Sequence, residues 1–120
     1  MWQKKVLVVE DNPLNARLFK DVLLSFECQV FVATKASETL HILKTKTPDL
    51  ILMDVQLPGV SGIELMRKIR QVPRFKHSKI IAVSAFVMQE EVRYLLFAGF
   101  DGFLSKPVDI YALKNLVSTL

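Results

Sequence analysis

The chain lacks most of the features that would place it outside a single globular domain. It has one cysteine, Cys28, in 120 residues, so it can form no internal disulfide, and we expect a small buried residue in a reducing compartment. Apolar runs such as VLVV and LILM are four residues long, far below the roughly 20 needed to cross a bilayer. No tract rich in proline, glycine or serine suggests a linker. These absences predict one cytoplasmic domain over residues 1–120, without membrane insertion or an export signal.

Acidic residues are fewer than basic ones, and the formal net charge is +4. Six basic residues gather in one segment: Arg67, Lys68, Arg70, Arg74, Lys76 and Lys79. Such a cluster could bind nucleic acid. The segment contains only one aromatic residue, Phe75, however, and helical spacing would turn its first basic side chains toward water. We therefore expect a solvated helix end and no nucleic-acid partner.

Five short runs of strand-forming residues recur along the chain. They are VLVV at 6–9, VFVA at 30–33, LILM at 50–53, IIAVS at 80–84 and GFLS at 102–105. Four of them are almost continuously apolar, which is typical of strands buried on both faces of a parallel sheet. Between them, apolar residues recur at helical spacing. The first such segment has Leu14, Leu18, Val22 and Phe26, and the last has Leu113, Leu116, Val117 and Leu120.

Helix ends are marked independently of the apolar pattern. Asn12 stands before Pro13, Ser61 begins a capping box, and Asp109 precedes the last helical segment. Gly99 is placed to close a helix in the left-handed conformation. The alternation of strands and helices predicts an α/β fold, a doubly wound, flavodoxin-like (βα)5 sandwich with five parallel strands in the order 2-1-3-4-5.

In such a fold, ligands bind at the carboxyl ends of the strands. The polar residues at these ends are Glu10 and Asp11 after the first run, Asp54 after the third, Ser84 in the fourth and Lys106 after the fifth. Two carboxylates ~4 Å apart would repel each other by about 4 kcal/mol. Positive charge is therefore needed, and Lys106 together with a hard divalent cation, Mg²⁺, would supply it.

A carboxylate beside Mg²⁺ and an ammonium group is suited to attack phosphorus. Asp54 would then become an aspartyl phosphate, and the Ser84 hydroxyl would donate a hydrogen bond to a phosphoryl oxygen. Taken singly, each of these residues is more often a surface or capping residue. Their arrival in order at four strand ends favours a joint site.

At these residues the sequence resembles the receiver domains of two-component response regulators, and the resemblance covers the whole chain. The matching motifs are VLVVED at 6–11, LILMDVQLPGVSG at 50–62, AVSA at 82–85 and GFDGFLSKP at 99–107. VEDNPLN with LFKDVL is most similar to the single-domain regulators of the DivK type, which control bacterial cell division and polarity. The resemblance implies a phosphorylation-dependent switch of a two-component phosphorelay, and not a turnover enzyme.

The resemblance implies roles for the site residues. Asp54 would accept a phosphoryl group from a phosphohistidine on a sensor histidine kinase or a histidine phosphotransfer protein. Glu10, Asp11 and the backbone carbonyl of Gln56 would join Asp54 around Mg²⁺. Phosphate lifetime would be tuned at Gln56 and Phe86.

The resemblance also implies how phosphorylation is transmitted. Lys106 would pair with the phosphoryl group, and its bond to Pro107 would be cis. Ser84 would move toward the phosphate and Phe103 would swing inward, which changes the surface of the last two helices and the fifth strand that a downstream protein reads. The kinase would dock on Pro13, Leu14, Leu18 and Pro107.

Other functions fit parts of the pattern. An aspartate-nucleophile phosphatase would need a second aspartate two residues after Asp54, where this chain has Gln56. A pseudo-receiver, which never takes phosphate, would tend to have lost the acids or the lysine, and all are present. The chain could also be a receiver module of a hybrid kinase or of a DNA-binding response regulator.

Overall fold

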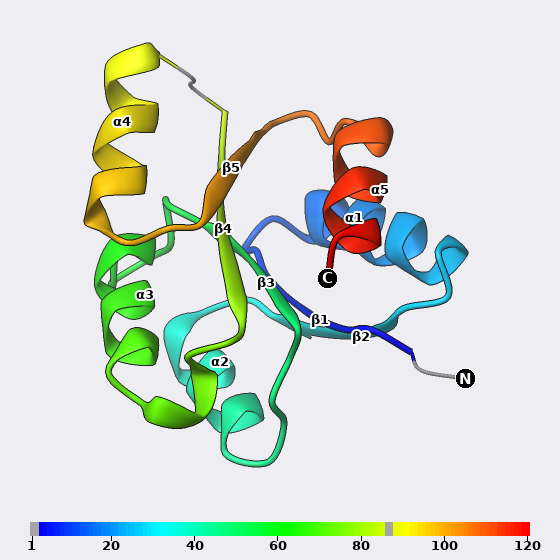
Figure 1. The fold of residues 1–120 in the computed structure, drawn as a ribbon, viewed down its shortest axis with the longest axis horizontal. Helices are drawn as coiled ribbons and strands as arrows, with labels where there is room; N and C mark the ends of the chain where they lie inside the picture. Colours follow the sequence, from blue (N-terminus) through cyan, green and yellow to red (C-terminus); the bar gives the residue numbers. More distant parts are fainter. Residues whose placement is uncertain (1–2, 86–87) are drawn as a thin grey trace.

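The structure, a computed structural model, describes residues 3–85 and 88–120, and within them strands and helices alternate along the chain (Figure 1). The strands are β1 (Lys5–Val9), β2 (Gln29–Ala33), β3 (Leu50–Asp54), β4 (Lys79–Ser84) and β5 (Gly102–Ser105). The helices are α1 (Pro13–Ser25), α2 (Ala36–Leu43), α3 (Gly62–Arg70), α4 (Gln89–Ala98) and α5 (Ile110–Ser118), with a 3-10 turn, η1 (Pro73–Phe75). Phe86, for which a role is predicted, lies outside the described residues. None of the helices within the described ranges combines the length and apolar character that a bilayer span needs.

The strands form one sheet in the order β2-β1-β3-β4-β5, and every neighbouring pair is parallel. Val8 of β1 lies opposite Val32 of β2 and Leu52 of β3. A parallel order of this kind follows when each strand is connected to the next by a helix that crosses one face of the sheet. The predicted fold class and strand order are confirmed.

Helices cover both faces of the sheet and make two separate apolar cores. Leu23 of α1 and Leu113 of α5 belong to the core on one face. Leu43 of α2, Leu65 of α3 and Leu95 of α4 belong to the core on the other face. Figure 1 shows the same division, with α1 and α5 together on one side of the strands and α3 and α4 on the other. Because both faces are covered, the central strands are apolar at nearly every position.

Cys28 lies between α1 and β2 and is packed into the core of the α1 and α5 face. Only 3% of the residue is exposed. Burial, and secondarily the charge of Asp49, raises the pKa of its thiol, so the reactive thiolate is disfavoured. The prediction of a small buried residue is confirmed.

The predicted helix caps are present. The Asn12 side chain accepts hydrogen bonds from the first turn of α1, the Ser61 hydroxyl accepts one in α3, and the Asp109 carboxylate does the same in α5. Gly99 ends α4 with φ of +130°, a backbone conformation that glycine adopts without a Cβ clash. Local sequence therefore determines where these helices begin and end.

The buried face of α1 does not include the whole i, i+4 series of apolar residues. Leu14 and Leu18, which begin that series and are also predicted docking residues, are 79% and 44% exposed. The helix instead buries Ala16, Phe19 and Leu23. Both series have helical spacing, so packing against the sheet decides between them.

The expectation of a solvated basic helix end is correct for Arg67 and Lys68 and wrong for Arg70. Arg67 and Lys68 are exposed. Arg70 is half-buried: its guanidinium donates a hydrogen bond to the Ser78 carbonyl at 2.9 Å and pairs with Asp101. It therefore connects the end of α3 to the segments that begin β4 and β5.

Candidate functional site

The predicted site residues meet at the carboxyl end of the sheet, in the upper part of Figure 1. Glu10 and Asp11 follow β1, Asp54 is the last residue of β3, and Ser84 is the last of β4. Lys106 follows β5 directly, and its backbone N–H donates to the Ser84 carbonyl at 2.9 Å. The parallel register brings strand ends that are far apart in sequence to the same side of the sheet.

Three carboxylates form a cluster at this end. Glu10, Asp11 and Asp54 each have an oxygen within 4.8 Å of the other two. Glu10 and Asp54 are 1% and 4% exposed, whereas Asp11 lies at the exposed rim. The cluster therefore combines two buried acids with one that reaches solvent. It also makes a hard oxygen donor set of the kind that binds Mg²⁺.

Lys106 provides the positive charge that the cluster requires. Its Nζ lies 2.8 Å from Glu10 Oε1 and 2.9 Å from Asp54 Oδ2. Burial lowers the pKa of the lysine, but its close contacts with the Glu10 and Asp54 carboxylates outweigh this effect, and the pKa is raised. The ammonium therefore stays charged and bridges two strand ends.

Glu10 remains under-compensated despite this ion pair. Its Oε2 accepts a hydrogen bond from the Asn12 N–H at 3.3 Å, but Oε1 is buried without a hydrogen-bond partner in the described part of the chain. The contact from Lys106 to Oε1 is thus an ion pair without hydrogen-bond geometry. Burial first, and then Asp54, raise the Glu10 pKa to about 7. A buried carboxylate oxygen of this kind favours a cation beside it.

The loop after β3 fixes the orientation of Asp54. The Gln56 N–H donates to Asp54 Oδ1 at 2.9 Å, which leaves Oδ2 directed to Lys106. Gly62 packs directly under this loop: a Cβ at Gly62 would lie 2.4 Å from the Asp54 carbonyl oxygen and 2.8 Å from the Val55 Cα. Sequence reasoning missed both contacts, although an aspartate two residues before a loop N–H is a known turn signal.

Ser84 and Phe103 lie on the same face of the sheet. Ser84 follows Ala82 by two residues on β4, and Ala82 is opposite Phe103 on β5. Because side chains alternate along a strand, Ser84 and Phe103 both project toward the α2 to α4 layer, where Phe103 packs half-buried against the core. Ser84 is 7% exposed. The predicted cis bond between Lys106 and Pro107 is present.

The residues predicted to dock a kinase are all exposed. Pro13 and Leu14 begin α1, Leu18 lies one turn further, and Pro107 follows the site lysine. Leu14 is 79% exposed, which is unusual for a leucine in the first turn of a helix that packs on a sheet. The exposure makes these side chains accessible to another protein.

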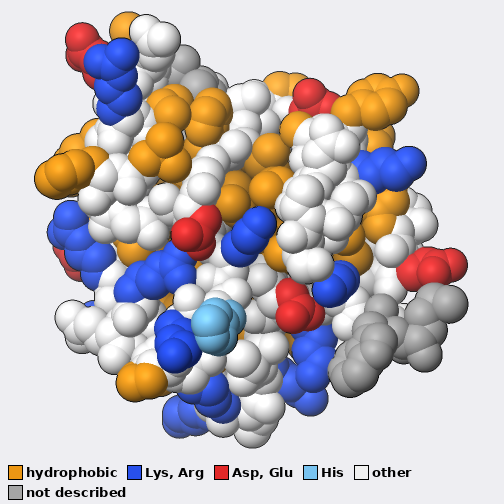
Figure 2. All heavy atoms as spheres, viewed as in Figure 1, with side chains coloured by type: hydrophobic (Ala, Val, Ile, Leu, Met, Phe, Trp, Pro, Cys, Tyr) orange, Lys and Arg blue, Asp and Glu red, His pale blue; other side chains and the backbone are white. Residues whose placement is uncertain are grey.

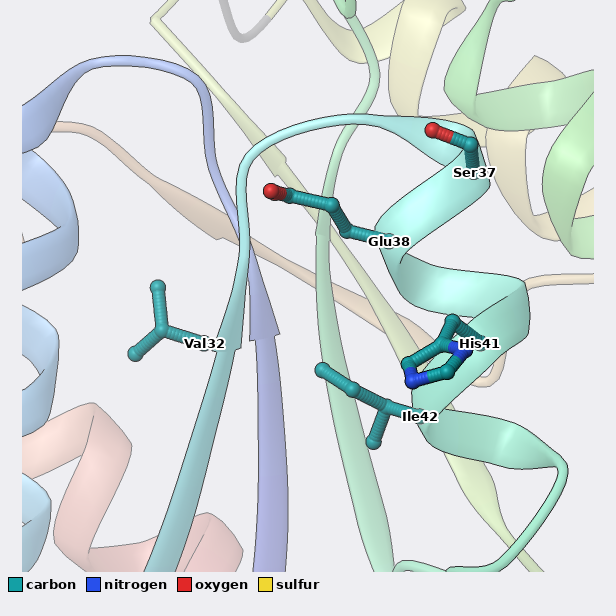
Figure 3. Close-up of a pocket in the computed structure, with 5 residues that line it drawn as sticks. All are labelled: Val32, Ser37, Glu38, His41 and Ile42. Atoms are coloured by element: carbon teal, nitrogen blue, oxygen red, sulfur yellow. The ribbon is translucent and has the colours of Figure 1, made fainter.

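A separate hollow of about 340 Å³ lies beside the edge strand and contains none of the predicted site residues. It is lined by Val32, Ser37, Glu38, His41 and Ile42, and Figure 3 shows Glu38 and Ile42 projecting from α2 toward β2. The Glu38 carboxylate accepts hydrogen bonds from the Thr34 N–H and hydroxyl, which lower its pKa. The Glu38 carboxylate thus already holds Thr34, which precedes α2, by hydrogen bonds. The residues that line the hollow do not combine several carboxylates with a lysine, as the predicted site does.

Comparison with known proteins identifies the family. The family model described as "Response regulator receiver domain" matches residues 6–118. The "Polar-differentiation response regulator DivK" of Brucella anthropi is 36% identical over 107 residues, which cover 89% of this chain and 87% of the relative. The DivK protein of Brucella ovis matches to the same extent.

Solved structures agree in fold. The chemotaxis response regulator CheY4 of Vibrio cholerae superposes with a TM-score of 0.91 at 25% identity, over 99% of this chain and all of that one. The receiver domain of the sensor histidine kinase PA1611 from Pseudomonas aeruginosa, solved with a magnesium ion in its active-site cleft, has a TM-score of 0.87 at 28% identity, over 98% and 97%. The chain therefore belongs to the response regulator receiver domains of two-component systems.

Proposed function

We propose that residues 1–120 form one receiver domain that acts as a phosphorylation-dependent switch, with Asp54 as the phosphoacceptor. The observation that carries the proposal is the contact of Lys106 Nζ with both Glu10 and Asp54, at 2.8 and 2.9 Å, beside a third carboxylate. An aspartate held between a lysine and two other acids has the surroundings that a phosphoryl group requires: a fixed cation and oxygen ligands for a second one.

In the proposed reaction, the Asp54 carboxylate attacks the phosphorus of a phosphohistidine on a sensor kinase or phosphotransfer protein. A bond forms between the carboxylate oxygen and phosphorus, and the phosphorus–nitrogen bond breaks. The bonding pair returns to the ring nitrogen, and a ring that is protonated on its other nitrogen leaves as neutral imidazole. The Lys106 ammonium pairs with the Asp54 carboxylate before the transfer and with the phosphoryl oxygens after it. The Gln56 N–H holds the carboxylate in orientation.

The carboxyl cluster fits a magnesium ion. We propose Glu10, Asp11, Asp54 and the backbone carbonyl of Gln56 as its protein ligands. The fit is supported by the buried Glu10 Oε1, which has no hydrogen-bond partner among the residues that the structure describes, and by the raised Glu10 pKa, since a cation would compensate both. When bound, Mg²⁺ neutralises charge on the transferring phosphoryl group.

We propose that Ser84 and Phe103 transmit the change. Ser84 moves its hydroxyl to a phosphoryl oxygen, and Phe103, on the same face and the neighbouring strand, turns into the space that is vacated. The altered surface of α4, β5 and α5 then regulates a partner protein. The kinase or phosphotransfer protein docks on Pro13, Leu14, Leu18 and Pro107. The likeness to the DivK proteins favours a pathway of cell division and polarity.

The proposal is tested by phosphotransfer from the purified histidine kinases and phosphotransfer proteins of the same cell. We expect the intact chain to gain one acid-stable, base-labile phosphoryl group only with Mg²⁺ present, and Asp54→Ala to gain none. Asp21→Ala, which removes an exposed acid of α1, is the matched control and should behave as the intact chain. Stoichiometric phosphorylation of Asp54→Ala, or repeated turnover of phosphate esters by the intact chain, would refute the assignment.

A further inference from the structure

The amino end of the sheet carries a second surface, on the opposite side of the molecule from the carboxyl cluster. A groove of about 300 Å³ runs between α2 and the segment formed by α3 and η1. Its lining consists of Leu40, Leu43, Lys44, Lys68, Ile69, Val72, Arg74 and Phe75. The proposed function uses none of these residues. We call this feature the α2–η1 groove.

The floor of the α2–η1 groove is apolar and firmly held. Leu43, Ile69 and Phe75 belong to the core and are 3%, 1% and 3% exposed. Leu40 and Val72 flank the floor and are 40% and 42% exposed. The groove is thus a depression in a packed core with two partly open apolar walls, and an inserted side chain would meet a preformed surface.

The rim of the groove is basic. Lys44 and Lys68 are exposed, and Arg74 is held by hydrogen bonds to the carbonyls of Leu43 and Lys44 at the end of α2. The Arg74 guanidinium also stacks over the Phe75 ring at 4.6 Å. Two of its five N–H donors face α2, so others remain for an anion. Residues 64–79 hold six basic residues and one acid, and Figure 2 shows Lys and Arg side chains gathered over this end of the molecule.

We propose that the α2–η1 groove docks an acidic segment of a partner protein, which inserts a large apolar side chain between Leu40 and Val72 and pairs its carboxylates with Lys44, Lys68 and Arg74. The groove volume of about 300 Å³ exceeds the roughly 150 Å³ that holds one benzene. It therefore accepts a leucine or phenylalanine side chain. The charges supply orientation, and the apolar insertion supplies most of the affinity.

The shape of the surface selects a protein over other anionic partners. A membrane requires apolar side chains that protrude, whereas Leu40 and Val72 are the walls of a depression. A single-stranded nucleic acid requires exposed aromatic rings on which bases stack, and Phe75 is buried under Arg74. The acidic cluster at the other end of the sheet repels the same partner, so the charge distribution directs it to the groove.

The probe is a fluorescein-labelled 12-residue peptide with a central Leu-Phe pair flanked by Asp and Glu, measured by fluorescence anisotropy at physiological salt. We expect saturable binding below 1 mM, and ¹⁵N shift changes concentrated at Leu40, Lys44 and Val72. A peptide with Gly-Ser in place of Leu-Phe should bind at least about tenfold more weakly. Shift changes centred on α4 or α5, or no saturation at 1 mM, would overturn the proposal.

Charge-reversal variants distinguish binding at the groove rim from attraction to the net charge of the protein. The double variant Lys44→Glu with Lys68→Glu should lower the affinity for the peptide by about tenfold. The control double variant, Lys20→Glu with Lys114→Glu, changes the net charge equally at exposed positions of α1 and α5. It should change the affinity less than about twofold. Equal losses in the two double variants would refute the site. Circular dichroism confirms that both variants are folded.

Two further measurements test whether peptide binding is independent of phosphorylation and whether the groove prefers a protein to other anionic partners. Asp54→Ala should bind the peptide as the intact chain does, whether or not Asp54 proves to be the phosphoacceptor. Vesicles of phosphatidylcholine with phosphatidylserine, and a single-stranded oligonucleotide, are offered at matched charge. If the protein bound the vesicles or the oligonucleotide more tightly than the acidic peptide, and lost this binding in Lys44→Glu with Lys68→Glu, the partner would be a membrane or a nucleic acid and the proposal would be wrong.

Discussion

At the amino end of the sheet, polar side chains are hydrogen-bonded to the backbone of neighbouring segments, whereas at the carboxyl end carboxylates face one another. The Ser78 hydroxyl donates to the Pro48 carbonyl at 2.6 Å, and Asp101 Oδ2 accepts from the Ile80 N–H at 2.8 Å while pairing with Arg70. At the other end, Glu10 Oε1 is buried and finds no hydrogen-bond partner in the described part of the chain, although it forms an ion pair with Lys106.

The difference separates groups that hold the sheet together from groups that are available to a ligand. A satisfied polar group contributes about 1 kcal/mol to stability and gains little from a new partner. An under-compensated buried carboxylate costs stability until a cation binds beside it. The following predictions test this contrast, from the largest expected effect to the smallest.

Gly62→Ala should have the largest effect on stability at the carboxyl end. The added Cβ would overlap the backbone of Asp54 and Val55, which cannot move without shifting the nucleophile. We expect a loss of about 3 kcal/mol in the free energy of unfolding and slower phosphorylation, measured by urea denaturation and phosphotransfer. Gly59→Ala is the control: Gly59 has φ of +83° but open space around its Cβ position, so it should lose only about 1 kcal/mol. Equal losses would contradict the overlap.

Lys106→Met should destabilise the metal-free protein and, in the same variant, slow phosphorylation. Removal of the ammonium leaves Glu10 and Asp54 facing each other without a positive charge. We expect a loss of about 2 kcal/mol, below the cost for a fully buried pair because the lysine is partly exposed. Mg²⁺ should recover part of it. Unchanged unfolding in the absence of Mg²⁺ would show that the bridge contributes nothing.

Asp101→Ala should lower stability without slowing phosphorylation. The substitution removes the carboxylate that accepts from the Ile80 N–H and pairs with Arg70, and we expect a loss of about 1 kcal/mol. Phosphorylation of Asp54 should proceed at the rate of the intact chain, because the altered contacts lie at the other end of the sheet. A loss of phosphotransfer larger than twofold would mean that the two ends are coupled.

The smallest expected effect is on pH dependence. A Glu10 pKa raised to about 7 means that the folded protein binds the proton more tightly than the unfolded chain. The stability from this group is therefore complete below the ordinary value of 4.5 and is lost as the pH rises through about 7. Without Mg²⁺, the free energy of unfolding, and with it the melting temperature, should therefore fall from pH 5 to pH 7.5. Mg²⁺ should raise it more at pH 7.5 than at pH 5, and the reverse order would contradict the role of Glu10.

Sequence predicts best what depends on neighbours in sequence. The five strands, the caps at Asn12, Ser61 and Asp109, and the positive φ of Gly99 follow from local residue types. The meeting of Glu10, Asp54 and Lys106 follows once a parallel sheet is assumed, since every strand then ends on the same side.

What sequence did not predict depends on packing between distant segments. In α1, two apolar series have helical spacing, and only contact with the sheet selects Ala16, Phe19 and Leu23 for burial. The Arg70 guanidinium reaches Asp101, which lies 31 residues further along the chain. No local pattern carries such pairs. The α2–η1 groove likewise exists only when the ends of two helices come together.

The burial of Cys28 has a practical consequence for observing the switch. Its thiol is packed in the core, with a raised pKa, and is the chain's only one. A maleimide or nitroxide reagent will therefore react with a cysteine introduced at an exposed position of α4, such as Tyr94, in preference to the native one. Site-specific labels can report movement of that helix in an otherwise unaltered protein.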